Sequence, residues 1–197
     1  MPAGRGLGQR VSRQRALARA GSGHDTEAVS EPTRTKDGRY VVIDGRKWRA
    51  TDPSIPEPLR VALVKELMAA RRAVRDAASD EEAVRAARAR VRDAKVALGE
   101  RGCPWWEEAT DEQLAPRLAA AFRALLRGRA EDATVCPSDG ARVAGGEGWR
   151  ARMDLARRVA REGVARGELQ LLRGGEPVEE GAELRGPIRV GRGPRFR

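Results

Sequence analysis

The sequence has few of the side chains that bind metals or form disulfide frameworks. Its 197 residues include one histidine, His24, and two cysteines, Cys103 and Cys136. No CxxC motif and no pair of histidines occurs, so the ligand set of a zinc site is missing. Two cysteines also exclude a disulfide framework, and we expect free thiols rather than the one disulfide they could form. We therefore predict no metal and no cofactor.

Long apolar segments and aromatic residues are scarce as well. No apolar run approaches the ~18–20 residues that a membrane helix requires. Residues 1–20 are basic but lack the apolar centre of a secretory signal. We therefore expect a soluble, cytoplasmic protein that does not contact a membrane. Aromatic residues make up 4% of the chain, which is too few for a groove that stacks several unpaired bases.

Catalytic motifs are also missing. Cys136-Pro137-Ser138-Asp139 could place a nucleophilic thiol at a helix N-terminus, but a small buried cysteine before a capped helix is the favoured interpretation. The Gly145–Gly148 segment lacks the lysine and hydroxyl residue of a phosphate-binding loop. We predict no catalytic residue, and a non-enzymatic role is favoured over an enzyme.

Positive charge is abundant and unevenly distributed. The net charge is +10, from 39 Lys and Arg against 29 Asp and Glu. Residues 1–36 hold seven of the basic and three of the acidic residues, and residues 191–197 hold three arginines and no acid. We expect both segments to be basic tails, with residues 1–36 disordered. Most of the excess charge would then lie outside the folded body.

A β-hairpin is predicted at the start of a first region, residues 37–108. Two β-rich runs, 39–43 and 46–50, flank Asp44-Gly45, which favours a two-residue hairpin turn. Alternation predicts one shared face for Tyr40, Val42 and Trp48. A two-stranded hairpin is marginal by itself, so we expect it to pack against helices.

A helical hairpin is predicted for the rest of this region. Leu59, Leu63, Leu67 and Ala70 recur at helical spacing. Ser79 and Glu82 form a predicted capping box at the start of a second helix, which ends at Gly99. Trp105 and Trp106 are expected to fill the thin core of this hairpin, and an exposed stacking platform for bases is the alternative.

A second region, residues 109–190, has the element order of a winged helix. Thr110 and Gln113 form a capping box before a helix with an apolar face; that face comprises Leu114, Leu118, Phe122, Leu125 and Leu126. A short extended segment, a short helix, a long helix at about 149–165 and two strands around a loop are expected to follow. This order is typical of a helix-turn-helix with a β-hairpin wing.

Several segments of this region carry a resemblance to a known family. They are Val135-Cys136-Pro137-Ser138, Gly148-Trp149-Arg150, Ala156-Arg157-Arg158, Gly167-Glu168 and Arg185-Gly186-Pro187-Ile188-Arg189. They resemble a bacterial domain-of-unknown-function family, and the resemblance implies a winged-helix-like fold for about 110–190. Residues 37–53 and 103–106 resemble segments that accompany this domain in longer bacterial proteins, some labelled biopolymer transporter Tol. The resemblance implies no catalytic residue.

The overall prediction is a mainly α protein with small β elements. Its candidate binding site is the long helix, where Arg150, Arg157, Arg158 and Arg161 are expected to face away from the apolar side formed by Trp149, Met153 and Ala160. Such a row could contact DNA phosphates or guanine edges. Asp154 in the same row and the acidic wing at 173–183 favour the alternative, a protein-interaction or scaffold module without DNA binding. The target, the partner and the oligomeric state are not predicted.

Overall fold

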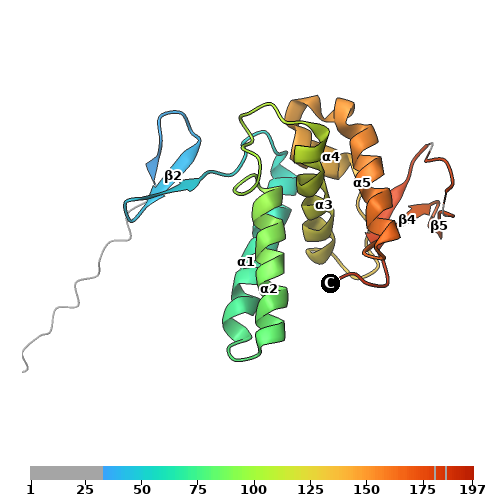
Figure 1. Ribbon diagram of the computed structural model, residues 1–197, viewed down its shortest axis with the longest axis horizontal. Coiled ribbons are helices and arrows are strands. Elements are labelled where there is room, and N and C mark those ends of the chain that lie inside the picture. Colours follow the sequence, from blue (N-terminus) through green and yellow to red (C-terminus); the bar gives the residue numbers. More distant parts are fainter. Residues whose placement is uncertain (1–32, 180, 185) are drawn as a thin grey trace, which may run out of the picture. The chain divides into compact units, whose positions relative to one another are not determined.

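The chain is mainly helical and contains two small antiparallel sheets (Figure 1). The computed structural model describes residues 33–179, 181–184 and 186–197. Within these ranges no helix combines the length and the apolar composition needed to cross a membrane. The predicted disordered segment falls largely on residues 1–32, which lie outside the described residues. The predicted mainly α class with small β elements is confirmed.

The first sheet contains the predicted hairpin and one additional strand. Strands β2 (Tyr40–Ile43) and β3 (Arg46–Arg49) flank Asp44 and Gly45, which both have positive φ angles, 50° and 71°. Two positive φ angles in succession are typical of the turn that connects a tight hairpin. Strand β1 (Thr33–Arg34) pairs with β2 in the order β1-β2-β3. The predicted start of order at Asp37 was therefore wrong, because pairing with β2 orders the residues before it.

The strand register corrects the predicted face of the hairpin. Val41 lies opposite Trp48, and Tyr40 lies opposite Arg49. Residues directly opposite each other share a face of the sheet, so Trp48 shares its face with Val41 and not with Tyr40 or Val42. Alternation assigns faces only within one strand. The length of the turn sets which residues of the two strands lie opposite each other. The two-residue turn Asp44-Gly45 places Trp48 opposite Val41, on the face that Tyr40 and Val42 do not share.

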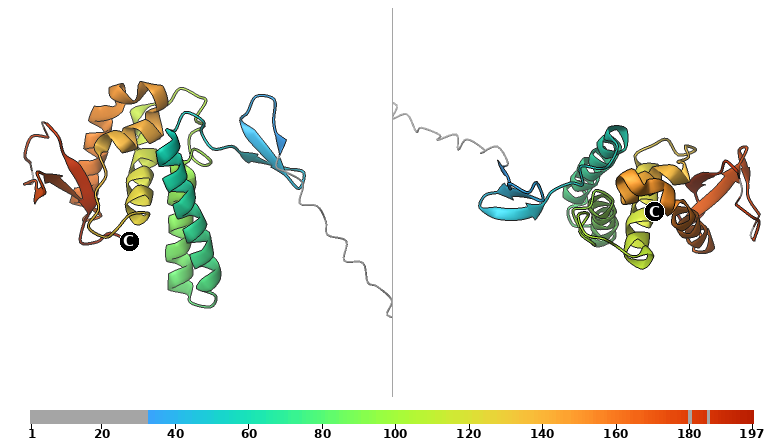
Figure 2. Two further views of the ribbon diagram at one scale, coloured as in Figure 1. Left: turned by 180° about the vertical axis from the view of Figure 1, so that it is seen from behind. Right: turned by 90° about the horizontal axis from the view of Figure 1, so that it is seen from above.

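The predicted helical hairpin is formed by α1 (Glu57–Asp76) and α2 (Glu81–Ala97), which Figure 2 also shows from behind. The predicted apolar residues Leu59, Leu63, Leu67 and Ala70 are all buried. Asp80, not Ser79, caps α2, since its Oδ1 accepts hydrogen bonds from the amides of Glu82 and Ala83. Gly99 follows α2 with a φ of 77°, as a helix stop requires.

The C-terminal elements follow the order predicted for residues 109–190. They are α3 (Asp111–Arg127), α4 (Pro137–Gly145), a 3₁₀ segment η1 (Gly146–Arg152), α5 (Met153–Ala165), β4 (Leu169–Arg173), β5 (Glu176–Pro177) and β6 (Arg189–Arg192). The sheet order is β5-β4-β6, and Val135 forms a bridge with Val190. The predicted long helix begins only at Met153, because Gly146 leaves α4 with a φ of 51° and the next residues form the 3₁₀ segment.

Helix α3 supplies the centre of the hydrophobic core. Its predicted apolar residues, including Leu118, Phe122 and Leu126, are fully buried, and it contacts α2, α4 and α5. The aromatic ring of Phe122 approaches the backbone of α4 at Gly140, where a Cβ atom would lie 2.6 Å from Phe122 Cε1. Only glycine allows this approach without a shift, so Gly140 sets how closely α3 and α4 pack.

The C-terminal residues 191–197 are part of the fold and not a free tail. Arg192 belongs to β6, and its Nη2 donates to the carbonyl oxygens of Leu126 (2.7 Å) and Arg129 (3.0 Å). Phe196 packs against the core, and the amide of Arg195 donates to the Gly167 carbonyl (2.8 Å). The prediction of a basic tail was therefore wrong. Carbonyl groups at the end of a helix lack amide partners within the helix, and Arg192 donates hydrogen bonds to two carbonyls at the end of α3.

Asp93 of α2 links this helix to α3. It is buried and forms ion pairs with Arg123 (2.7 Å) and Arg127 (2.7 Å). Burial raises the pKa of Asp93, but hydrogen bonds and the charges of the two arginines lower it by more. The net result is a pKa below the ordinary value, so the ionised carboxylate is the form that the fold stabilises.

This shift predicts an acid-sensitive contribution to stability. The pKa of Asp93 is lower in the folded chain than its unfolded value of about 3.9. The ionised carboxylate therefore adds to the free energy of unfolding above about pH 3.9, and this contribution is lost as the pH falls through the folded pKa. We expect urea titrations below about pH 4 to show a steeper loss of unfolding free energy for the wild type than for Asp93→Asn. Asp154→Asn, which changes an exposed carboxylate, should keep the wild-type slope. Equal slopes for all three would contradict the assignment.

Candidate functional site

Helix α5 carries three of the four predicted site arginines. Ala156, Val159 and Ala160 turn its apolar side into the core, and this places Arg158 and Arg161 on its exposed face with Arg157 partly buried beside them. The fourth, Arg150, lies on η1 ahead of the helix. The predicted single row is therefore divided between two elements.

An open groove of about 740 Å³ lies between α5 and the C-terminal sheet; we call it the α5 groove. Val164 of α5, Leu171 of β4, and Val178 and Leu184 of the wing form its apolar floor. Its charged lining residues are Arg157, Arg158, Arg161, Asp154, Glu162 and Glu179. Three cations therefore face three carboxylates, and the groove combines an apolar floor with balanced charge.

The three arginines of the α5 groove are held by weak contacts. Arg157 pairs with Asp154 (3.4 Å) and Arg158 with Asp111 (3.7 Å), while Arg161 Nη2 donates to the Ala182 carbonyl (3.0 Å). Exposed pairs of this kind contribute at most about 1 kcal/mol, so a bound anion can replace them. The Nε of Arg157 is buried and has no hydrogen-bond partner.

Trp149 was predicted to lie on the inward side of the long helix, and it does not. It lies on η1 and is only half-buried. The guanidinium groups of Arg142 and Arg150 lie 4.4 Å and 4.6 Å from the centre of its ring. These distances are typical of cation–π contacts. Arg150 therefore stacks on Trp149 and covers η1, and does not extend the row on α5.

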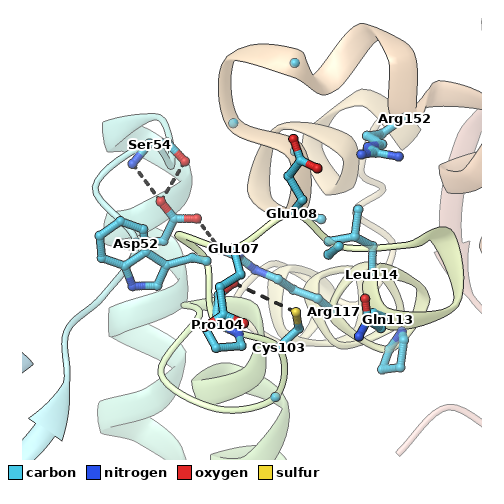
Figure 3. A pocket seen from close by; sticks show the side chains of 18 of the residues that line it. Asp52, Ser54, Cys103, Pro104, Glu107, Glu108, Gln113, Leu114, Arg117 and Arg152 are labelled. Carbon is cyan, nitrogen blue, oxygen red and sulfur yellow. Dashed lines mark hydrogen bonds and ion pairs between the residues drawn. The ribbon is translucent and has the colours of Figure 1, made fainter. Parts of the chain in front are cut away.

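A second cavity, of about 800 Å³, lies where the connector after β3 meets α3 and η1 (Figure 3). Arg117 of α3 forms its wall, with Nη2 2.7 Å from Asp52 Oδ2 and Nε 3.1 Å from the Ala97 carbonyl. Asp52 also accepts hydrogen bonds from the amide and hydroxyl of Ser54. This arrangement joins the connector, the end of α2 and α3 through one buried ion pair.

The ion pair at this cavity has a structural role. Burial lowers the pKa of the Arg117 guanidinium, and the charge of Asp52 opposes that shift. Both groups are directed at each other and at the backbone, so neither is available as a general acid or base. Sequence reasoning missed this pair, although an arginine between Leu114 and Leu118 on the buried side of α3 was a detectable sign of it.

Both cysteines form hydrogen bonds only with neighbouring residues of the chain in the described ranges. Cys103 and Cys136 are free thiols. Cys136 Sγ accepts a hydrogen bond from the Ser138 hydroxyl (2.9 Å), and its amide donates to Asp139 Oδ2 (3.2 Å). These contacts are local caps of α4. Nowhere in the described part of the chain are three or more potential ligands grouped to hold a metal ion.

A family model matches the C-terminal part of the chain. A search of curated proteins found no match. The family model, described as "Protein of unknown function (DUF3253)", matches residues 115–193. The match begins within α3 and ends after β6, so it contains the whole α5 groove. It also continues past residue 190 into the segment predicted to be a tail. Residues 115–193 of this chain are therefore similar to a domain found in proteins of unknown function.

Proposed function

We propose that this protein is a non-enzymatic binding module whose C-terminal domain binds double-stranded DNA in the manner of a winged helix. In such domains one helix enters the major groove and a β-hairpin wing contacts the adjacent backbone. The order α3, α4, α5 and sheet supports this assignment, together with the bridge between Val135 and Val190. Helix α5 is then the recognition helix, and the loop after β4 is the wing.

One observation carries the proposal: Arg157, Arg158 and Arg161 line a single open groove on α5. Guanidinium groups form paired hydrogen bonds with phosphates and with the edge of guanine. The contacts that now hold these arginines are weak enough to be exchanged for such partners. The basic residues of segment 1–36 add attraction that does not depend on DNA sequence.

The double variant Arg157→Ala/Arg161→Ala is expected to lose sequence preference but not all DNA binding. A duplex enriched by the wild type from a random library should bind the wild type about tenfold or more tightly than a scrambled duplex, since each direct base contact is worth roughly 1–3 kcal/mol. The double variant should bind both duplexes alike, with a salt dependence that remains because the N-terminal charges remain. Fluorescence anisotropy over a salt series measures both effects.

Arg166→Ala is the matched control for this experiment. Arg166 caps the C-terminus of α5 and pairs with Glu168 (3.2 Å), outside the groove. The variant Arg166→Ala removes one arginine from the end of the same helix, and it should retain the wild-type preference for the enriched duplex. If Arg166→Ala loses as much preference as the double variant, the preference does not depend on the arginines that line the α5 groove.

A protein-interaction role is the second candidate function. The apolar floor formed by Leu171, Val178 and Leu184, with balanced charge around it, suits an amphipathic peptide better than a phosphate backbone. Acidic residues of the wing would also repel DNA. If the full chain binds no duplex even at low salt, DNA binding is excluded and this second candidate becomes the leading one.

A further inference from the structure

A third groove, of about 580 Å³, lies between the first sheet and the helical hairpin; we call it the hairpin groove. Its basic lining residues are Arg34, Arg46, Arg49, Arg71, Lys95 and Arg101, and its carboxylates are Asp44 and Glu100. Positive charge therefore exceeds negative charge in its lining. The α5 groove, in contrast, is balanced.

The strand register explains how this groove forms. Arg34 is paired with Val41, and Val41 with Trp48, so these three residues share one face of the sheet. Ile43 and Arg46 are opposite each other on the same face. Ile43 is 45% exposed and Trp48 is 41% exposed. One face of a small sheet thus presents a partly exposed aromatic ring among cations.

The indole of Trp48 differs from those of Trp105 and Trp106, for which a stacking platform was the alternative prediction. Trp105 donates its Nε1 hydrogen to the Ala50 carbonyl (3.0 Å), and Trp106 packs against Trp105 and Tyr40. Both are half-buried and hold the sheet to the loop before α3. The ring of Trp48 instead lies beside two cations, with Arg46 at 4.4 Å and Lys95 at 5.7 Å from its centre.

Most cations of the hairpin groove have no anionic partner in the described residues. Glu100 is already engaged by Lys95 (3.3 Å) and by the hydroxyl of Thr51 (3.0 Å). The side chains of Arg34, Arg71 and Arg101 form no hydrogen bond or ion pair with another described residue. Segment 1–32 holds five arginines and three carboxylates, so its composition adds net positive charge. A groove with this excess of positive charge attracts polyanions.

We propose that the hairpin groove binds a short stretch of single-stranded nucleic acid. One base stacks on the exposed indole of Trp48, and the neighbouring phosphates pair with the surrounding arginines. Cations beside an aromatic ring are the combination that single-strand binding proteins use. One stacked base is also consistent with the low aromatic content of the chain. The hairpin groove shares no residue with the α5 groove, so this site is separate from the proposed duplex site.

The test measures binding of the full chain to labelled oligothymidine and oligouridine of about 12 nucleotides. Trp48→Ala should weaken binding about tenfold, because stacking of one base contributes that order of affinity. Trp48→Phe should retain most of it, because a phenyl ring also stacks. Tighter binding of one oligomer identifies DNA or RNA as the strand recognised. Thermal unfolding followed by circular dichroism confirms that each variant is folded.

A charge-matched pair of variants tests the geometry of the hairpin groove. Arg46→Glu and Lys47→Glu make the same charge change at adjacent residues of β3, but Lys47 lies opposite Val42 on the other face and does not line the groove. Arg46→Glu should weaken single-strand binding about tenfold or more, and Lys47→Glu should change it by less than about twofold. Equal losses would overturn the proposal, because they would show only a general effect of charge.

Three other outcomes also overturn this proposal. They are no single-strand binding by the wild type, no effect of Trp48→Ala, and equally tight binding of an acidic peptide such as polyglutamate. The variant Arg157→Ala/Arg161→Ala should leave single-strand binding intact. If it abolishes single-strand binding while Arg46→Glu does not, the strand occupies the α5 groove. If single-strand binding persists and duplex preference is absent, only the proposed duplex function fails.

Discussion

Replacing Arg117 with alanine is expected to lower the free energy of unfolding by about 3–5 kcal/mol. The variant leaves the carboxylate of Asp52, which is 3% exposed, without its cation. It also leaves the Ala97 carbonyl without the donor that Arg117 provides. A buried charge without a partner costs far more than an exposed one. Urea denaturation followed by circular dichroism measures the loss.

Two control variants separate the effect of burial from the loss of an ion pair. Arg158→Ala removes an arginine that is half exposed and pairs with Asp111 at 3.7 Å, so it should cost no more than about 1 kcal/mol. Removing both charges together, as Asp52→Leu/Arg117→Met, should cost less than Arg117→Ala alone, because no unpaired charge remains. If Arg117→Ala and Arg158→Ala cost the same, Arg117 does not join the connector to the helices.

Deleting residues 191–197 is expected to destabilise the chain by about 3 kcal/mol or more, since two hydrogen bonds from a charged donor and a packed aromatic ring are lost. The deletion removes half of β6, the contacts of Arg192 with the end of α3, and Phe196. A free tail could be removed without any change in stability. Urea denaturation of the truncated and full-length chains distinguishes the two cases.

A single substitution tests the same docking in the full-length chain. A Cβ atom at Gly193 would lie 2.4 Å from the carbonyl oxygen of Gly167 and 2.7 Å from that of Leu169. Backbone atoms cannot move aside as a flexible side chain can, so Gly193→Ala should destabilise the chain as well. Gly148→Ala is the control, because no atom lies within 4 Å of its Cβ position and its φ is not positive. If truncation and Gly193→Ala both leave stability unchanged, the segment is not docked.

Much of the secondary structure was predictable because it depends on local chemistry. Asp44-Gly45 predicted the hairpin turn, and Thr110 with Gln113 predicted the capping box that begins α3. The spacing of Leu59, Leu63 and Leu67 predicted the buried face of α1. Each of these patterns acts within a few residues along the chain, through a turn geometry, a cap or a helical period.

The errors concerned contacts between distant residues. The start of order was misplaced because β1 is ordered only by pairing with β2. The C-terminal segment was taken as a tail because its partners, Leu126 and Arg129, lie more than sixty residues earlier. Trp48 was assigned to the wrong face because the register depends on the turn and not on alternation in one strand.

In the candidate site, too, local features were predictable from the sequence and contacts between distant residues were not. Sequence reasoning identified Arg157, Arg158 and Arg161, which line one groove. It did not identify the apolar floor under them, which comes from β4 and the wing, nor the stacking of Arg150 on Trp149. The hairpin groove was also not predicted, because Arg34, Trp48, Arg71 and Arg101 come from separate segments that only packing brings together.

The sequence by itself determined the mainly helical class, the order of the elements, the lack of a metal-binding motif and the excess of positive charge. Composition, periodicity and turn chemistry carry that information locally. Only the tertiary structure decided where the charge is neutralised and where it is not. Asp93 and Asp52 are ion-paired with arginines of α3, whereas the arginines around Trp48 lack anionic partners among the described residues. Charge interactions depend on distance and burial in space, which a sequence does not state.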